Sequence, residues 1–284
     1  MYWNNELVNV IIQRALLEDV GMGDVTTDNL IESDHQSEGF ILAKEEGIIA
    51  GLNVAQMVFN RLDKGIEFKP LLKDGDSVKD GDEIVKLRGP TRTILKGERV
   101  ALNFLQRLSG IATKTHHYLA LVKDFPVRIT DTRKTTPTLR ILEKYAVTIG
   151  GGNNHRMGLY DAVMIKDNHI IAVGGILKAV NIIRAKIPHT TKIEVEVENM
   201  NEVEEALEAK VDIIMLDNMD VKTMFEAVNY INGRAIVEAS GGITEENVRD
   251  VAKTGVDVIS IGALTTHVKS LDISLELEKQ GVRS

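Results

Sequence analysis

The sequence lacks cysteine altogether, which excludes disulfide bonds and thiolate chemistry and permits a reducing compartment. It also lacks a basic excess, because its formal net charge is −8. Nucleic acids and membrane surfaces are polyanions that require a basic face, so we expect neither as a partner. Long apolar runs are missing too, since the stretch from Gly47 to Phe59 contains Asn53 and Gln56 and is too short to span a bilayer. The acidic N-terminal segment is unlike a signal peptide, so we expect a cytoplasmic protein.

What is present is an ordinary globular composition. The chain has 284 residues, 43% of them hydrophobic and 27% charged, which is enough for a barrel or for two domains. The helical spacing of Leu7, Ile11 and Ala15 predicts a helix over residues 5–19. Strand-like runs follow at 39–43 and around residue 48. The stretch 73–85 places two Asp-Gly turns beside alternating apolar residues, which predicts a β-hairpin in a small β sandwich.

A long helical pattern separates this part from the rest of the chain. Between residues 96 and 122 the apolar positions keep a helical period, which predicts one or two packed helices with a break near Ser109 and Gly110. His116 and His117 lie on this segment. Adjacent residues of a helix face different directions, so these two histidines indicate a surface pair rather than a metal site.

After residue 126 short β-branched runs alternate with amphipathic stretches, as in a β/α array. The predicted strands are 127–131, 162–166, 192–197, 212–216, 235–239 and 257–261. The predicted helices lie near 137–148, 176–187, 201–209, 220–231 and 245–254. Six such units are two short of an eightfold barrel, so we predict an incomplete β/α barrel. Residues 271–277 alternate like one more strand, which could return to the N-terminal part.

The predicted fold class is therefore α/β, with an N-terminal α/β sandwich domain and a C-terminal incomplete (β/α) barrel. We place the sandwich at residues 1–115, joined by a C-terminal strand within 266–284. The barrel, with the active site, occupies residues 116–265.

Polar or glycine residues follow every predicted strand of the barrel. Reactive groups of barrels lie at the carboxyl ends of the strands, so these positions are the candidates for chemistry. They are Asp131-Thr-Arg-Lys134, Lys166-Asp-Asn-His169, Glu196, Asp217-Asn218, Ser240-Gly-Gly242 and Gly262.

Cations gather in one part of this acidic chain. Between residues 128 and 166 there are seven Lys and Arg and three Asp and Glu, a local charge of +4, which predicts an anionic ligand. Arg140 and Lys144, spaced i,i+4, indicate a solvated helix face. The cations that adjoin strand ends or the glycine-rich loop before His155 are ligand candidates, because arginine suits planar carboxylates and lysine supplies a point charge. These are Arg133, Lys134, Arg156 and Lys166.

Two further features indicate a phosphate and a cation. Ser240-Gly-Gly242 and Gly262 follow the last two strands, where barrels commonly bind phosphate with backbone amides. Glu196 and Asp217 belong to neighbouring predicted strands. They could bind Mg²⁺, ribose hydroxyls or a developing positive charge, or they could form salt bridges with Lys166 or Arg133.

Several long motifs resemble those of the quinolinate phosphoribosyltransferase family over almost the whole chain. They are Glu18-Asp-Val-Gly-Met-Gly-Asp-Val-Thr-Thr27, Glu98-Arg-Val-Ala-Leu-Asn-Phe-Leu-Gln106, Leu108-Ser-Gly-Ile-Ala-Thr113, Asp131-Thr-Arg-Lys-Thr-Thr-Pro137, His155-Arg-Met-Gly-Leu159, Ile165-Lys-Asp-Asn-His169, Ile193-Glu-Val-Glu-Val197, Met215-Leu-Asp-Asn218 and Glu238-Ala-Ser-Gly-Gly-Ile243. The resemblance implies phosphoribosyl transfer from phosphoribosyl diphosphate to quinolinate with loss of carbon dioxide, a step of NAD biosynthesis.

The resemblance also implies roles for single residues. The quinolinate carboxylates would be held by Thr132, Arg133, His155, Arg156 and Lys166, with Lys134 shared with phosphoribosyl diphosphate. Glu196 and Asp217 would face the ribose and its Mg²⁺, directly or through water, and would form the catalytic set with Lys134 and Lys166. Ser240, Gly241, Gly242 and Gly262 would cradle the 5′-phosphate. It further implies a homodimer in which Arg99 reaches into the partner's site. Thr138 departs from the family's pattern, since relatives commonly carry glycine there.

Three alternatives remain open at this point. Salvage transfer to nicotinate requires a site for one carboxylate instead of two. A Schiff-base aldolase would use Lys166 as its nucleophile. A carrier or ligand-binding module could be built on the Asp-Gly turns, although the exposed lysine that carrier domains modify is missing.

Overall fold

The computed structural model describes residues 4–279, which divide into two compact units. The first unit contains residues 4–116, 136–151 and 267–279, and the second contains 117–135 and 152–266. Our division at residues 115 and 265 stays a prediction, but the helix within 136–151 groups with the first unit and not with the barrel. Residues 280–284 of the predicted C-terminal segment lie outside the described residues.

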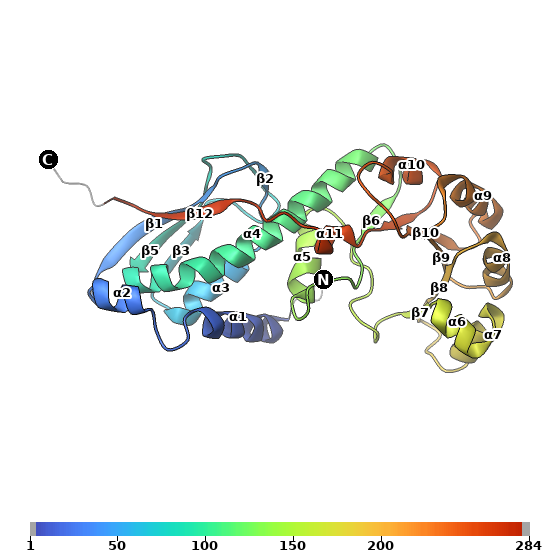
Figure 1. The fold of residues 1–284 in the computed structure, drawn as a ribbon, viewed down its shortest axis with the longest axis horizontal. Coiled ribbons are helices and arrows are strands. Elements are labelled where there is room, and N and C mark those ends of the chain that lie inside the picture. The colour runs from blue at the N-terminus through green and yellow to red at the C-terminus, as the bar shows by residue number, and fades with distance from the viewer. Residues whose placement is uncertain (1–3, 280–284) are drawn as a thin grey trace. The chain divides into compact units, whose positions relative to one another are not determined.

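The first unit is built on an antiparallel sheet with the strand order β12-β1-β5-β3 (Figure 1). The predicted strand at 271–277 forms as β12 and pairs with β1, Ala43 lying opposite Ile273. The predicted N-terminal helix also forms, and the Asn4 side chain caps it by accepting the N–H groups of Glu6 and Leu7. The elements of this unit are α1 (Asn5–Asp19), α2 (Val25–Leu30), β1 (Gln36–Ala43), β2 (Gly47–Ile48), α3 (Leu52–Leu62), β3 (Glu67–Pro70), β4 (Ser77–Val78), β5 (Glu83–Pro90), α4 (Thr91–Val122, up to residue 116), α5 (Arg140–Ile149) and β12 (Ile273–Leu277).

The predicted hairpin at 73–85 is wrong in its pairing. Both Asp-Gly turns form, because Gly75 and Gly81 adopt φ angles of +97° and +89° and each turn closes with a backbone hydrogen bond. The strand between the turns, β4, pairs with β2, whereas β5 pairs with β1 and β3. The turn residues determine the local bend but leave the choice of partner strand to the rest of the unit.

The predicted break near Ser109 and Gly110 is also wrong, since α4 continues through both residues. A Cβ atom at Gly110 would lie 2.2 Å from the carbonyl oxygen of Lys269, so the glycine lets the C-terminal segment approach the helix closely. Glycine at position 150 also permits a close approach, because a Cβ atom there would lie 2.4 Å from the carbonyl oxygen of Ala112. His116 and His117 are both exposed on α4, as predicted.

The expectation of a solvated face at Arg140 and Lys144 is wrong as well. Helix α5 buries Lys144 to 1% exposure, next to a fully buried Glu143. Glu143 accepts hydrogen bonds from the Arg107 side chain and from the Thr136 backbone N–H. These charges therefore belong to the packing of the first unit.

The second unit is a parallel sheet flanked by helices, with the strand order β6-β11-β10-β9-β8-β7. All predicted strands of the barrel form. Because β6 and β7 are not paired with each other, the barrel is incomplete, as predicted. The elements are β6 (Arg128–Thr130), β7 (Val163–Ile165), α6 (Asp167–Val173), α7 (Ile176–Arg184), β8 (Ile193–Val197), α8 (Met200–Glu208), β9 (Ile213–Asp217), α9 (Val221–Ile231), β10 (Ile236–Ser240), α10 (Val248–Lys253), β11 (Val258–Ser260) and α11 (Ala263–Thr266). The short helices α6 and α11 were not predicted.

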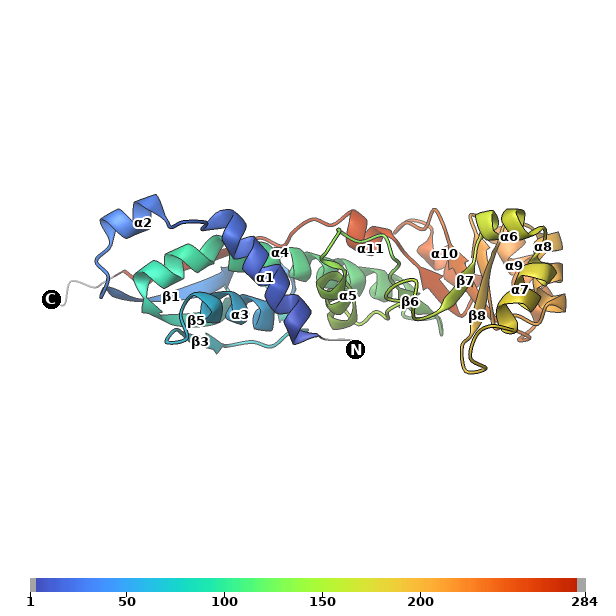
Figure 2. The same ribbon diagram turned by 90° about the horizontal axis from the view of Figure 1, so that it is seen from below.

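The two faces of this sheet differ in polarity. In β8, Ile193, Val195 and Val197 are buried on the face that α7 and α8 contact. Glu194 and Glu196 point to the opposite face, because successive side chains of a strand alternate. Figures 1 and 2 show α7, α8 and α9 together on one side of the strands. The helix side of the sheet is thus apolar, and the other side carries the acids.

None of the helices formed by residues 4–279 combines the length and the hydropathy that a membrane crossing requires.

Gly110→Ala should destabilise the protein by about 1–3 kcal/mol, because the added methyl group would overlap the Lys269 carbonyl oxygen. In an exposed helix the same change would stabilise by about 1 kcal/mol, so the sign of the change is decisive. Urea unfolding followed by circular dichroism measures it. Asn103→Ala, at an exposed position of the same helix, is the control. A Gly110→Ala protein as stable as the wild type would contradict the close approach.

Candidate active site

The predicted strand-end residues lie along the carboxyl edge of the parallel sheet in an order that the strand order determines. From β6 to β7 the edge carries first Thr132, Arg133 and Lys134, then Gly262, then Ser240 to Gly242, and then Asp217, Glu196 and Lys166. Cations therefore occupy both ends of the edge, glycine loops lie beside β6, and carboxylates lie between the glycine loops and β7.

Lys134 is positioned by the loops after β6 and β11. Its backbone N–H donates to the Thr132 hydroxyl at 3.0 Å, and its carbonyl accepts the Thr265 hydroxyl at 2.6 Å. A Cβ atom at Gly262 would lie 3.0 Å from Cδ of Lys134, so glycine leaves room for the lysine stem. The exposed Lys134 side chain thus extends past a glycine loop.

The loop after β10 requires glycine. Gly241 has φ +83°, and a Cβ there would lie 2.3 Å from Oδ1 of Asn218. Gly242 has φ +63° and is exposed. The Asn218 backbone N–H donates to the Ser240 carbonyl, which ties this loop to the end of β9. Such a bare backbone turn at a strand end can bind an anion through its amides.

Lys166 and Glu196 form an ion pair between β7 and β8. The Glu196 side chain is 11% exposed and the Lys166 side chain is 40% exposed, so the pair opens to solvent on the lysine side. This confirms the salt bridge that the sequence allowed for Glu196. Asp217, on the neighbouring β9, accepts a hydrogen bond from the Asn218 side chain at 2.8 Å.

Residues 153–156 lie between the two edge strands. Asn153 forms a parallel bridge with Thr130, through hydrogen bonds with the backbones of Ile129 and Asp131. The buried Asp131 carboxylate accepts the backbone N–H of His155 at 2.9 Å. This segment therefore continues the sheet beyond β6.

The Arg156 guanidinium completes the link to β7. It donates to the Ala162 carbonyl at 3.3 Å and lies 3.4 Å from the Met164 sulfur. Burial lowers the pKa of Arg156, and the neighbouring Arg133 lowers it further, while Glu194 and other acids oppose both effects. Two guanidinium groups that repel each other in this way would be stabilised by an anion between them.

His155 reaches two acids that we did not single out in the sequence, Glu194 of β8 and Glu238 of β10. Its Nε2 atom lies 3.3 Å from the Glu194 carboxylate and 3.5 Å from that of Glu238. Burial opposes charge on the imidazole, while these two carboxylates favour it and raise the pKa of His155. Burial also raises the pKa of Glu194. The signal that could have identified both acids is the strand alternation, which places Glu194 on the face of Glu196 and Glu238 on the face of Ser240.

Two residues of the first unit bear on the predictions. Arg99 is exposed on α4. Thr138, where the family resemblance leads one to expect glycine, has φ +71°, in the left-handed region that glycine favours. A β-branched residue there is strained by about 1–2 kcal/mol.

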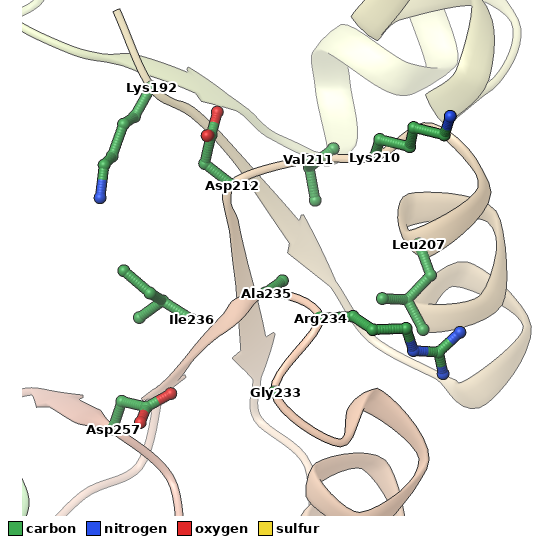
Figure 3. A pocket seen from close by; sticks show the side chains of 10 residues that line it. All are labelled: Lys192, Leu207, Lys210, Val211, Asp212, Gly233, Arg234, Ala235, Ile236 and Asp257. Atoms are coloured by element: carbon green, nitrogen blue, oxygen red, sulfur yellow. The ribbon is translucent and has the colours of Figure 1, made fainter.

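A pocket of about 800 Å³ lies at the opposite, amino-terminal edge of the same sheet, beside Lys192, Lys210 and Arg234 (Figure 3). Its acids have structural contacts, since Asp212 accepts the backbone N–H of Ile193, the first residue of β8, and Asp257 accepts that of Val237, the second residue of β10. Barrels use this edge for stability and the carboxyl edge for chemistry. The pocket is therefore not our candidate site.

Comparison with known proteins identifies the family of the chain. The family models "Quinolinate phosphoribosyl transferase, N-terminal domain" and "Quinolinate phosphoribosyl transferase, C-terminal domain" match residues 24–109 and 111–276. The chain belongs to the quinolinate phosphoribosyl transferase family. The family predicted from the sequence motifs is thus confirmed, and the fold it implies agrees with the two units described above.

Individual relatives of this family are similar over nearly their whole lengths. A probable nicotinate-nucleotide pyrophosphorylase [carboxylating] from Synechocystis sp. is 46% identical, over 95% of this chain and 92% of the relative. Its counterpart from Bacillus subtilis is 45% identical, over 96% and 94%. The crystal structure of NadC from Streptococcus pyogenes is 43% identical and matches with a TM-score of 0.94, over 98% of this chain and 99% of that one.

Proposed function

We propose that the protein transfers the phosphoribosyl group of phosphoribosyl diphosphate to the ring nitrogen of quinolinate and releases pyrophosphate and carbon dioxide. The product is nicotinate mononucleotide, which places the enzyme in de novo NAD biosynthesis. The observation that carries this proposal is the near full-length similarity to relatives named carboxylating nicotinate-nucleotide pyrophosphorylases. The cations at both ends of the carboxyl edge supply the charge that two carboxylates and a phosphate require.

The substrate contacts that we propose follow the order of the edge. Arg133, His155, Arg156 and Lys166 hold the two carboxylates of quinolinate, with Thr132 beside them. Lys134 is close to the glycine loops and serves phosphoribosyl diphosphate as well. Ser240, Gly241, Gly242 and Gly262 cradle the 5′-phosphate, because their turns present backbone where a side chain would otherwise intrude.

The chemistry is mainly positioning and charge stabilisation. As pyrophosphate departs, positive charge develops on the ribose carbon, and Glu196 and Asp217 face it. The pyridine nitrogen attacks that carbon, and no covalent enzyme intermediate is needed. The ion pair with Glu196 leaves Lys166 a partly exposed cation, unlike the desolvated amine that a Schiff-base aldolase needs.

Loss of carbon dioxide follows from the same binding. Once the ring nitrogen is quaternary, the carbon–carbon bond to the adjacent carboxylate breaks and leaves its electron pair on the ring carbon. The positive nitrogen stabilises that carbanion, which then takes a proton. The enzyme contributes by desolvating and orienting the carboxylate, for which the half-buried Arg156 is suited.

Glu196 and Asp217 suit an indirect contact with Mg²⁺. Each carboxylate already has a protein partner, Lys166 and Asn218 respectively. Carboxylates so engaged can accept hydrogen bonds from the water ligands that Mg²⁺ usually keeps. When bound with the diphosphate, Mg²⁺ would neutralise the charge of the leaving group.

We further propose a homodimer in which Arg99 of one subunit completes the site of the other. Arg99 is exposed. Large apolar side chains are also exposed on α1, α2 and their connection, among them Leu17, Met22, Val25 and Leu30. Such side chains suit burial in an interface. The cytoplasmic location stays a prediction.

With phosphoribosyl diphosphate and Mg²⁺, the protein should convert quinolinate to nicotinate mononucleotide with one carbon dioxide per turnover. Nicotinate should react poorly, because it lacks the second carboxylate and would leave cations of the site unpaired. Chromatography of the mononucleotide and capture of labelled carbon dioxide measure both products. Preference for nicotinate would favour the salvage reaction, and borohydride trapping of a sugar phosphate on Lys166 would favour the aldolase.

Arg133→Ala should lower turnover of quinolinate by more than about 100-fold, because a charge-assisted carboxylate contact is lost. The melting temperature should change little. Arg128→Ala is the matched control, since Arg128 is an exposed arginine at the other end of the same strand. Near-normal kinetics of Arg133→Ala would contradict its role.

Arg99→Ala and Lys166→Ala proteins should each be inactive, and their mixture should regain activity after subunit exchange. Random exchange would restore one complete site in each mixed dimer, about a quarter of wild-type activity. The control mixture combines Arg133→Ala with Lys166→Ala, which affect the same subunit's site and should stay inactive. No recovery under demonstrated exchange would exclude a shared site.

A further inference from the structure

The contacts of His155 occupy both ring nitrogens within the protein. Nδ1 accepts the backbone N–H of Arg156 at 2.7 Å, and Nε2 faces the carboxylates of Glu194 and Glu238. We propose that Glu194 and Glu238 are positioning residues. Glu194 accepts the Nε2–H of His155, Glu238 faces the same nitrogen at 3.5 Å, and together they fix the imidazole that holds the Arg156 backbone. This rests on the proposed function, in which His155 and Arg156 bind quinolinate.

The tautomer follows from the contact at Nδ1. A nitrogen that accepts a backbone N–H carries no proton. The two carboxylates favour a charged imidazole, but a proton on Nδ1 would set its N–H against the Arg156 N–H, so the contact at Nδ1 requires a neutral ring with its proton on Nε2. That N–H points at two carboxylates, which in the ionised form can only accept hydrogen bonds. Each of the three contacts thus supports the same orientation of the ring.

A metal ion is the obvious alternative for these three groups, since their ligand atoms lie within 4.8 Å of one another. A metal would need the lone pair of Nε2, and a ligating imidazole ordinarily donates its other N–H to an acceptor. Here the other nitrogen faces an N–H donor instead. The geometry therefore favours a hydrogen-bonded unit over a metal site.

Two carboxylates hold the ring better than one could. Glu194 and Glu238 come from β8 and β10, which are separated by β9, so they approach Nε2 from different strands. Both side chains are nearly buried, with 4% and 5% exposure, so water competes little for the contact. The rigid sheet can thereby orient a residue from the connection between β6 and β7.

The consequence is a specific kinetic effect. If the ring turns, Nδ1 no longer meets the Arg156 N–H, and the guanidinium loses its alignment with quinolinate. The phosphate cradle lies on other loops and should be unaffected. Loss of either carboxylate should therefore weaken quinolinate binding and spare phosphoribosyl diphosphate.

Glu194→Gln and Glu238→Gln, which keep the size of the side chain, test the proposal. Each should raise KM for quinolinate about tenfold or more and change KM for phosphoribosyl diphosphate less than about threefold. In a His155→Ala background the same changes should have no further effect, because the acids act through His155. Glu208→Gln, at an exposed position of α8, is the matched control.

Two results would overturn the proposal. One is an effect of Glu194→Gln or Glu238→Gln on KM that adds to that of His155→Ala. An equal effect on KM for quinolinate and KM for phosphoribosyl diphosphate, as a general packing defect would give, counts in the same way. The other is stoichiometric binding of Mn²⁺ or Zn²⁺ to the wild-type protein, measured by equilibrium dialysis, if Glu194→Gln abolishes that binding.

A readout without turnover separates this proposal from the proposed function. In ¹⁵N-histidine spectra of the wild-type protein, His155, assigned with His155→Ala, should carry its proton on Nε2. The Nε2–H resonance should shift in each glutamine variant. If it does while quinolinate is not converted, the proposed function fails and the positioning unit stands. A proton on Nδ1, with or without one on Nε2, would refute the unit.

Discussion

The site depends on the alternation of side chains in the parallel sheet. Because Ile193, Val195 and Val197 must face the helices, the two residues between them, Glu194 and Glu196, must face the other side. A carboxylate held away from water is costly unless it is paired and hydrogen-bonded. The acids of this face therefore require cationic or N–H partners, and these come from outside the strands.

Several of these partners belong to the chain between β6 and β7, the two edge strands that the incomplete barrel leaves unpaired with each other. The segment 153–156 bonds to the backbone of β6 and contacts β7 through Arg156, so it occupies the seam. An unpaired strand edge needs such cover. The same segment carries His155 to the acids and Arg156 to the side of Arg133. The segment 153–156 thus covers the open strand edges, supplies a partner to the buried acids and carries residues proposed to bind the dicarboxylate.

Sequence patterns predicted the second unit well because its strands are short, buried and followed by polar residues at one edge. Other patterns were ambiguous. A glycine in a helical stretch weakens the helix locally, yet Gly110 lies inside a continuous helix because a distant backbone approaches it. The Asp-Gly turns form without determining which strands pair. The spacing of Arg140 and Lys144 is the same for a solvated face as for the buried contact of Lys144, so only the fold distinguishes them.

Glu194 and Glu238 show why the site could be predicted only in part. The rule that reactive groups follow strand ends identified Glu196, Asp217 and Ser240, and it passed over acids within the same strands. Their alternation with buried residues does place them on the face of the site. Their partner is separated from them by 39 residues in one case, and no local pattern connects so distant a histidine to a strand. The contact arises from the way the seam between β6 and β7 is filled, which is a property of the folded sheet.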